Sequence, residues 1–568
     1  MKLFRKIQKW FENQENLYYL FLIILIVPNI VLCFTEPMPL VAKVCNVLLP
    51  FSIYHMIMSW SGNCGKTFWI LFPFLFFGAF QIVLLYLFGQ SVIAVDMFLN
   101  LVTTNPGEAL ELLDNLIPAI IIVVLLYIPA LILAAVAVSQ KRRLSETFVR
   151  RERKRARITV IAGILSLVAA YLFDARYELK SDLYPANVCY NIALAFQRTA
   201  QTQHYAETSK DFTFQAKTTR PEKNREVYVM VIGETSRAAN WSIYGYNRNT
   251  NPELTKIKGL TAFSHVLTES NTTHKSVPML MSSVTAHDFN SIYRQKGIIT
   301  AFKEAGYRTA FFSNQRYNHS FIDFFGKEAD ICDFIKEDTG DGSYNPSDDE
   351  LLKLVAAELA ENASKQFIVL HTYGSHFNYR ERYPADHAFF LPDFPVDAEL
   401  KYKDNLINAY DNSIRYTDNF LARLIRMLQE QDIDAAMLYT SDHGEDIFDD
   451  DRHLFLHASP VPSYYQIHVP FLIWMSDNYR KNYPDLFKNA EINRQKNISS
   501  SASFFQTMLE LGGIDTPSRN DSLSVINASY TEKNRVYLND HNEARSLNDI
   551  GMREEDFTML QTKGIVYR

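Results

Sequence analysis

Long apolar segments crowd into the first third of this chain, and they constrain its fold more than any other feature. A helix needs roughly 20 apolar residues to cross a bilayer core about 30 Å thick. Five segments reach or nearly reach that length: 17–35, 38–60, 67–89, 116–139 and 157–173. The first is too long, and is followed by too many others, to be a cleaved signal peptide. Because so many apolar runs are hard to bury in a soluble core, we expect a five-helix transmembrane domain over residues 1–174.

Basic residues predict the orientation of these spans, because Lys and Arg gather on the cytoplasmic side of a membrane. The segment 141–157, between the fourth and fifth spans, holds nine Lys or Arg. The loop 90–115 on the opposite side holds none. We therefore expect the N-terminus to lie in the cytoplasm and everything after Asp174 to lie on the other side of the membrane. The basic segment could also bind nucleic acid, but its position favours anionic lipid headgroups, and the net charge of −6 gives no sign of a nucleic-acid partner.

From Val227 onward, short apolar runs alternate with helical stretches. The apolar runs are 227–233, 309–312, 366–372, 435–441 and 468–474, and helical periodicity marks 351–363 and 416–431. Buried strands that alternate with helices predict an α/β domain with a mostly parallel central sheet. We therefore expect a connector over 175–225 that packs along the membrane surface, followed by a large extracytoplasmic domain over 226–568.

Three of the predicted strands end in polar residues that could bind a metal or a substrate, and at the end of 366–372 these are His371 to His376. Glu234 follows 227–233, and Asp442 and His443 follow 435–441. Ligands bind beyond the carboxyl ends of parallel strands, and a carboxylate buried there needs a cation beside it. Carboxylate and imidazole ligands suit zinc, or manganese where oxygens predominate. An exposed loop glutamate and a helix-capping aspartate remain the alternatives.

Other polar residues could join such a site. His376 and His457 are lone histidines, with His371 and His453 as their competitors. Thr273 lies in the polar stretch ESNTTHKSVP. Its hydroxyl would be a nucleophile only if a metal or a base lowered its pKa. By composition alone, all of these residues could equally be structural.

Longer motifs join these residues into one pattern. GETSRAANWSIYGYNRNTNPEL (233–254), NTTHKSVPMLMSS (271–283), HTYGSHFNYRERYP, AYDNSIRYTD and YTSDHGEDIF follow one another along the chain. Together with the five spans, they resemble the phosphoethanolamine transferase family of the alkaline phosphatase/sulfatase superfamily, over essentially the whole chain. The resemblance implies an alkaline-phosphatase-like (sulfatase) fold for 226–568. It also implies a multi-pass protein of the bacterial inner membrane, with this catalytic domain in the periplasm.

The resemblance also implies roles for individual residues. Glu234, Asp442 and His443 would bind one zinc ion tightly together with the Thr273 hydroxyl, and a second ion would bind during turnover. Thr273 would attack phosphatidylethanolamine and form a phosphothreonine intermediate. The acceptor of the phosphoethanolamine would be lipid A or a core sugar of lipopolysaccharide, so the partners are membrane lipids.

Three further residues match positions near the substrate in the family. His376 and His457 match positions that contact the phosphoryl group. Asn314 falls in the segment FFSNQRYN, where the family contacts its substrate.

The nucleophile loop departs from the lipid A transferases, which flank it with disulfide cysteines. Glu269 and Met279 stand there in this chain, and its five cysteines form no CxxC pair. The loop must therefore be held in another way, and the pattern looks more like the branch that modifies core sugars.

Two other functions remain open. A phosphoglycerol transferase would share the spans, the metal site and the threonine, but the signature at 233–254 speaks against it. A non-catalytic membrane sensor with a decayed hydrolase domain is the other alternative. The presence of every inferred ligand and of the nucleophile speaks against that decay.

Overall fold

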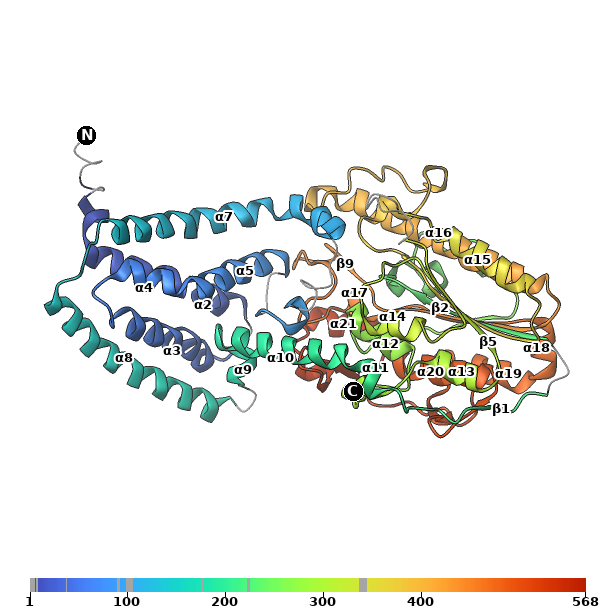
Figure 1. The fold of residues 1–568 in the computed structure, drawn as a ribbon. Helices are drawn as coiled ribbons and strands as arrows, with labels where there is room; N and C mark the ends of the chain where they lie inside the picture. The colour runs from blue at the N-terminus through green and yellow to red at the C-terminus, as the bar shows by residue number, and fades with distance from the viewer. Residues whose placement is uncertain are drawn as a thin grey trace. The chain divides into compact units, whose positions relative to one another are not determined.

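The computed structural model describes residues 6, 9–36, 38–88, 92–98, 106–174, 177–221, 225–336 and 345–567, without the side chains of 87–88 and 106–115. The chain divides into two compact units, Met1–Gln197 and Arg198–Arg568 (Figure 1). The boundary between them lies within helix α10 (Ala186–Gln203), inside the predicted connector.

In its described part, the first unit contains helices joined by short loops, and no strands. Its helices are α2 (Gln14–Thr35), α3 (Leu40–Met58), α4 (Cys64–Ile70), α5 (Phe72–Phe88), α7 (Pro106–Ser139), α8 (Glu146–Phe173) and the short α9 (Leu179–Asp182). Within the described ranges, α2, α3, α7 and α8 are long and apolar enough to cross a membrane. Helices α4 and α5 meet at an angle of 61° and would make a fifth, broken span. The predicted number of five spans thus depends on counting this bent pair as one.

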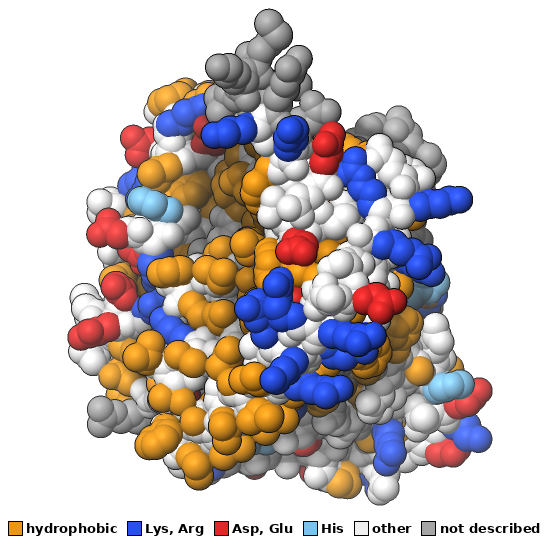
Figure 2. Space-filling model, turned by 90° about the vertical axis from the view of Figure 1, so that its left-hand side faces the viewer, with side chains coloured by type: hydrophobic (Ala, Val, Ile, Leu, Met, Phe, Trp, Pro, Cys, Tyr) orange, Lys and Arg blue, Asp and Glu red, His pale blue; other side chains and the backbone are white. Residues whose placement is uncertain are grey.

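Helix α8 carries two kinds of surface along its length. Its first half exposes basic side chains, among them Arg150, Lys154 and Arg157. Its second half exposes large apolar side chains, among them Leu165 and Leu172. Figure 2 shows Lys and Arg side chains grouped beside a broad hydrophobic area. A basic end followed by an apolar surface is typical of a helix that enters a bilayer from its anionic, cytoplasmic side.

A seven-stranded sheet forms the centre of the second unit, in the order β3-β11-β8-β2-β7-β5-β6. The strands are β2 (Glu226–Gly233), β3 (Leu260–Ala262), β5 (Arg308–Ser313), β6 (Ile331–Phe334), β7 (Lys365–His371), β8 (Asp434–Ser441) and β11 (Phe471–Met475). The neighbours β8, β2, β7, β5 and β6 are parallel. Strand β11 is antiparallel to both β8 and β3. The sheet is therefore mixed, and the predicted parallel order holds for five neighbouring strands.

Helices cover both faces of this sheet (Figure 1). Helices α15 (Asp349–Ala360) and α16 (Lys403–Gln429) lie on one face. The other helices of the unit are α11 (Tyr205–Thr208), α12 (Thr273–Leu280), α13 (Ile298–Glu304), α14 (Phe321–Gly326), α17 (Tyr464–Ile467), α18 (Asp477–Asn482), α19 (Pro484–Asn493), α20 (Ser500–Leu511) and α21 (Glu554–Thr562). Alternate residues of β2 pack in one core with α12, α13 and α20. Since both faces are covered, β2, β7 and β8 are buried along their whole length.

Four short strand pairs complete the second unit. They are β1 (Lys217–Thr218) with β13 (Ile514–Asp515), β4 (Val266–Leu267) with β12 (Ile498–Ser499), β9 (Asp446–Ile447) with β10 (Phe455–Leu456), and β14 (Val536–Leu538) with β15 (Ala544–Ser546). The pair β9 and β10 follows β8 along the chain and shapes the loops at its carboxyl end.

The register of the central strands brings their carboxyl ends together. Ile232 of β2 lies opposite His371 of β7 and Thr440 of β8. Gly233 lies opposite Ser441. The residues that follow these three strands therefore meet at one edge of the sheet, as the rule for parallel strands predicts.

Candidate metal and nucleophile site

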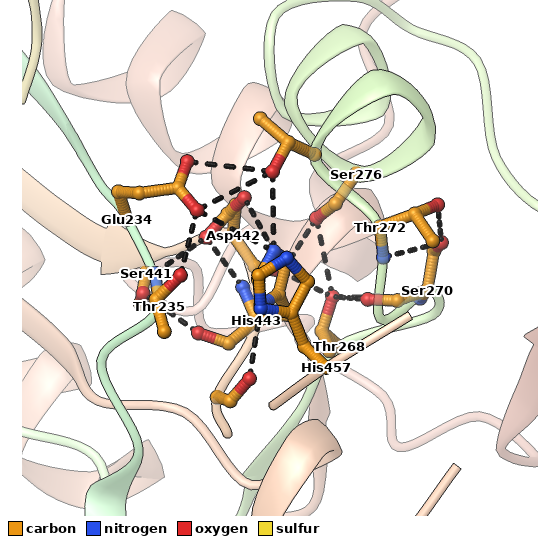
Figure 3. A network of polar contacts seen from close by, with 12 residues as sticks. Glu234, Thr235, Thr268, Ser270, Thr272, Ser276, Ser441, Asp442, His443 and His457 are labelled. Atoms are coloured by element: carbon orange, nitrogen blue, oxygen red, sulfur yellow. Dashed lines mark hydrogen bonds and ion pairs between the residues drawn. The ribbon is translucent and has the colours of Figure 1, made fainter. Parts of the chain in front are cut away.

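Glu234, Asp442 and His443 meet beyond the carboxyl ends of β2 and β8. One ligand atom from each residue lies within 4.8 Å of the others, and all three residues are buried. His443 Nε2 lies 3.5 Å from Glu234 Oε1 and 3.2 Å from Asp442 Oδ2. Figure 3 shows the three side chains pointing toward one another. Two carboxylates and one imidazole form a donor set that suits zinc.

Thr273 completes this cluster from another element. It is the first residue of α12, which begins directly after the loop 268–272. Its Oγ1 lies 3.4 Å from each carboxylate oxygen of Glu234 and 3.1 Å from His443 Nε2. The first turn of a helix favours negative charge because its N–H groups lack intrahelical partners. A hydroxyl at this position is suited to attack a phosphoryl group.

The hydrogen bonds of His443 and His376 fix which ring nitrogen of each carries a proton. His443 Nδ1 lies 2.9 Å from the Gly444 carbonyl oxygen. A carbonyl oxygen can only accept, so Nδ1 donates and Nε2 keeps a lone pair for a metal. His376 Nδ1 lies 2.6 Å from the Phe377 carbonyl oxygen, with the same consequence for its Nε2.

Burial shifts the pKa values of all three residues in this cluster. Burial, followed by repulsion from Asp442, raises the pKa of Glu234 well above its usual value. Burial also raises the pKa of Asp442 to about 6 and lowers the pKa of His443 far below its usual value. Two carboxylates this close are stable in ionised form only beside a cation. The residues present therefore fit a divalent metal.

His457 and His376 lie beside the cluster, whereas their sequence competitors do not. The His457 ring centroid is 4.2 Å from that of His443 and 5.9 Å from that of His376. His371 is buried at the end of β7, with Nδ1 3.4 Å from Ser313 Oγ. His453 is exposed in the turn before β10.

The segment around Asn314 meets the site through a different residue than predicted. The Asn314 amide donates to the Pro346 carbonyl oxygen and to Asp348 Oδ1, at 3.0 Å and 2.7 Å. It does not face the cluster. The neighbouring Gln315 donates to Glu234 Oε2 at 3.3 Å and to the Thr372 carbonyl oxygen at 3.1 Å. Consecutive side chains at the end of a strand point in opposite directions. This alternation could have shown from the sequence that only one of Asn314 and Gln315 faces the cluster.

Thr235 is a residue of the candidate site that the sequence pattern did not single out. Its φ of +57° is unusual for a β-branched residue. Its N–H donates to Asp442 Oδ1 at 3.1 Å, and its hydroxyl donates to Glu234 Oε1 at 2.7 Å. Its carbonyl oxygen accepts from the Tyr410 hydroxyl at 2.7 Å. These bonds hold the strained residue where it orients both carboxylates.

Gly374 allows a second loop to approach Glu234. Its φ is +51°. A Cβ at this position would lie 2.6 Å from the Glu234 carbonyl oxygen. Any side chain there would push the loop 372–376, which carries His376, away from β2.

Hydroxyl groups tie the nucleophile loop to the metal-ligand loop. Thr268 Oγ1 and Ser276 Oγ both donate to the Asp442 carbonyl oxygen, at 2.8 Å and 2.6 Å (Figure 3). All five cysteines are free. Polar contacts therefore take the place of a disulfide at this loop.

The likeness to known proteins agrees with this geometry. A model of the sulfatase family matches residues 226–514, just over half of the chain. The chain belongs to the sulfatase family. A second family model, described as phosphoethanolamine transferase EptA/EptB, matches residues 63–200.

Curated relatives carry the same description. The Kdo(2)-lipid A phosphoethanolamine 7''-transferase of Escherichia coli (strain K12) is 32% identical over 304 residues, or 51% of each chain. Phosphoethanolamine transferase EptC of Escherichia coli O18:K1:H7 is 26% identical over 318 residues, or 54% of each chain. The matches thus span about half the length of these relatives. The predicted resemblance to the phosphoethanolamine transferases is confirmed.

Solved structures extend the likeness in fold. Lipooligosaccharide phosphoethanolamine transferase A (EptA) from Neisseria meningitidis, an integral membrane protein, superposes with a TM-score of 0.71 at 20% identity and covers 90% of this chain and 97% of that one. The C-terminal periplasmic domain of EptC from Escherichia coli, in complex with Zn, gives a TM-score of 0.54 at 24% identity over 59% of this chain and 95% of that one. At these identities the likeness concerns the fold.

Proposed function

We propose that this chain transfers phosphoethanolamine from phosphatidylethanolamine to a lipopolysaccharide acceptor, through a zinc site and a phosphothreonine at Thr273. The observation that carries the proposal is the position of the Thr273 hydroxyl, 3.1 Å from His443 Nε2 and 3.4 Å from both Glu234 oxygens.

Glu234, Asp442 and His443 would hold the zinc ion. Bound there, zinc would lower the pKa of the threonine hydroxyl and offset negative charge on the phosphoryl oxygens. Other residues of the chain would orient the ligands and favour the phosphate group. Thr235 and Gln315 orient the two carboxylates, and the N-terminus of α12 favours the incoming phosphate group.

The transfer would take place in two displacement steps. The Thr273 oxygen bonds to phosphorus as the bond from phosphorus to the glycerol oxygen breaks; threonine loses its proton, and diacylglycerol leaves with a proton taken up. An acceptor oxygen then displaces Thr273 in the same manner, and the threonine regains a proton. His376 and His457 lie beside the cluster with ring nitrogens able to contact the phosphoryl group.

The acceptor is proposed from the relatives. One curated relative is named for its action on Kdo(2)-lipid A. We extend this to lipid A or a core sugar of lipopolysaccharide here, in a bacterial inner membrane with the second unit in the periplasm. Mass spectrometry of lipopolysaccharide from cells with and without the chain would locate added phosphoethanolamine, and an unchanged lipopolysaccharide would refute the acceptor.

The donor and the nucleophile are tested together. Purified full-length chain is incubated with labelled phosphatidylethanolamine or labelled phosphatidylglycerol, and peptides containing residue 273 are analysed by mass spectrometry. We expect phosphoethanolamine on Thr273 from the first lipid, and none in Thr273→Ala. Modification from phosphatidylglycerol alone would establish the phosphoglycerol alternative, and no modification from either lipid would favour a non-catalytic sensor.

A further inference from the structure

The side chain of Gln466 occupies a buried position between the loops that form the site. It belongs to α17 and is 1% exposed. Its Oε1 accepts from Asn271 Nδ2 at 2.5 Å and lies 3.1 Å from Ser459 Oγ, whose hydroxyl donates to the Val461 carbonyl oxygen at 2.6 Å. Its Nε2 donates to Asp446 Oδ2 at 2.6 Å and to the Leu456 carbonyl oxygen at 3.3 Å. Both N–H groups of the amide therefore have acceptors, and its oxygen has a donor in Asn271.

The partners of Asn271 fix the orientation of this amide. Asn271 Nδ2 also donates to the Ser459 carbonyl oxygen at 2.8 Å. The Tyr537 hydroxyl donates to Asn271 Oδ1 at 2.5 Å. Because a carbonyl oxygen can only accept, the Asn271 nitrogen must face Ser459 and Gln466. Gln466 therefore presents oxygen to Asn271 and nitrogen to Asp446.

These contacts reach three segments that are far apart in sequence. Asn271 lies two residues before Thr273, the proposed nucleophile. Asp446 lies three residues after His443, and Gly444 N–H also donates to the Gln466 carbonyl oxygen at 2.8 Å. Leu456 and Ser459 flank His457 on either side. One glutamine thus contacts the nucleophile loop, the metal-ligand loop and the His457 loop.

We infer that Gln466 is a positioning residue, whose amide sets the spacing between Thr273, the metal ligands and His457 in a chain without a disulfide at its nucleophile loop. The inference rests on the proposed function for its effect on rate. A shift of about 1 Å in a reacting group can slow a reaction on the order of a hundredfold. A buried amide that bonds to several loops at once is well suited to prevent such a shift.

A matched pair of variants separates positioning from general stability. Gln466→Met removes the amide at the site. Gln506→Met removes a second buried amide, which bonds to the Ser518 carbonyl oxygen and the Asn520 N–H at 2.9 Å and 2.8 Å in another part of the same unit. We expect both variants to lose thermal stability. Only Gln466→Met should slow phosphothreonine formation, by about tenfold to a hundredfold with little change in KM.

A reciprocal exchange tests the direction of the hydrogen bond. In Gln466→Glu, the new carboxyl group at position 466 faces the carboxyl group of Asp446. Neither group donates a hydrogen bond when ionised, so the rate of phosphothreonine formation should fall. In the double variant Asp446→Asn with Gln466→Glu, the donor and the acceptor are exchanged and the bond can form again. We expect the double variant to recover most of the rate that Gln466→Glu loses.

Backbone hydrogen exchange provides a readout that does not depend on catalysis. In the full chain, Gln466→Met should speed amide exchange over 268–273 and 442–446, and Gln506→Met should leave both segments unchanged. Unaltered exchange in Gln466→Met, or equal loss of rate in both methionine variants, would overturn the inference. If wild-type chain forms no phosphothreonine, the proposed function fails, and the exchange data alone decide whether Gln466 fixes the loops.

Discussion

Glu234 and Asp442 are buried carboxyl groups on either side of the His443 imidazole, and their charge governs the site at the scale of single residues. Each lies at a strand end where water is excluded. Repulsion between them makes the ionised pair unfavourable without a cation. Metal binding and the ionisation of these two groups should therefore depend on each other.

Substitution of one ligand tests this dependence. Asp442→Asn keeps the shape of the side chain but removes one charge. We expect zinc affinity to fall by more than the roughly 10- to 100-fold that loss of an outer-shell partner costs, as measured by zinc content after gel filtration. Asp418→Asn is the control, because Asp418 is also buried but bonds to the N–H groups of Glu253 and Leu254. An Asp442→Asn variant that keeps one zinc per chain would contradict the assignment.

The residues that could be predicted from the sequence share one property. Glu234, Asp442 and His443 come directly after long apolar strands, so a rule about strand ends finds them. Gln466 follows no such rule, because its partners lie in loops that only the folded chain brings together. Thr235 does follow β2, but a threonine there has neither a carboxylate nor an imidazole to mark it as part of a metal site. The histidines were ambiguous for the same reason, and geometry separates His457 from His453.

At the scale of elements, apolar segments of the sequence predicted the positions of the strands but not whether neighbouring strands are parallel or antiparallel. β2, β5, β7 and β8 match the predicted segments closely. The run 468–474 overlaps β11, yet β11 is antiparallel to β8, since an apolar run carries no direction. Helix α16 begins at Lys403, well before the predicted 416. The first half of α16 buries polar residues such as Asn412, which accepts hydrogen bonds from the N–H groups of Phe389 and Phe390. Because polar residues occupy buried positions there, the helical spacing of apolar residues cannot be seen in the sequence.

The loop after β7 yields a prediction about a glycine. Gly374→Ala would place a methyl group against the Glu234 backbone, whereas Gly306→Ala would meet open space at a similarly left-handed φ of +88°. The backbone penalty is about 1–2 kcal/mol for each variant. We expect Gly374→Ala to lose more thermal stability than Gly306→Ala and also to lose zinc content. Equal losses in the two variants would mean that the loop can move away from Glu234 without consequence.

His468 joins α17 to the loop before β4 and makes stability depend on pH. Its Nδ1 accepts from the Tyr464 hydroxyl at 2.8 Å, and its Nε2 donates to the Ser264 carbonyl oxygen at 3.0 Å. Burial lowers its pKa to about 4, and the nearby Arg535, Lys563 and His265 act in the same direction. The folded chain therefore binds fewer protons here than the unfolded chain, whose histidine pKa is near 6.5.

The free energy of unfolding should consequently fall as the pH drops from about 6.5 toward 4. The contribution of His468 to this loss is about 2 kcal/mol by pH 5. Thermal unfolding followed by near-UV circular dichroism at pH 7 and pH 5 would measure it. His468→Gln cannot titrate, so its melting temperature should change less between the two pH values. An identical change in wild type and variant would show that other groups cause the effect.

At the scale of the whole molecule, the first unit's spans and charges set the sidedness of the second. The segment 141–157 carries nine Lys or Arg, and α8 changes from a basic to an apolar surface within one helix. Moving this segment across a membrane would transfer nine charges through a low-dielectric core, which the positive-inside rule reflects. The second unit, which follows α8, should then lie on the opposite side.

Cysteine labelling of the full chain tests this sidedness directly. Cys189 is exposed, so it is first replaced by serine. Thr147→Cys and Lys533→Cys then place single exposed thiols before the last span and in the second unit. In intact spheroplasts, a membrane-impermeant maleimide should label position 533 and spare position 147, and permeabilisation should expose both. Labelling of both in intact spheroplasts would place the basic segment outside, and labelling of neither would place the second unit, with its candidate metal site, in the cytoplasm. Since the proposed function places the second unit in the periplasm, that last result would remove the proposed function along with the topology.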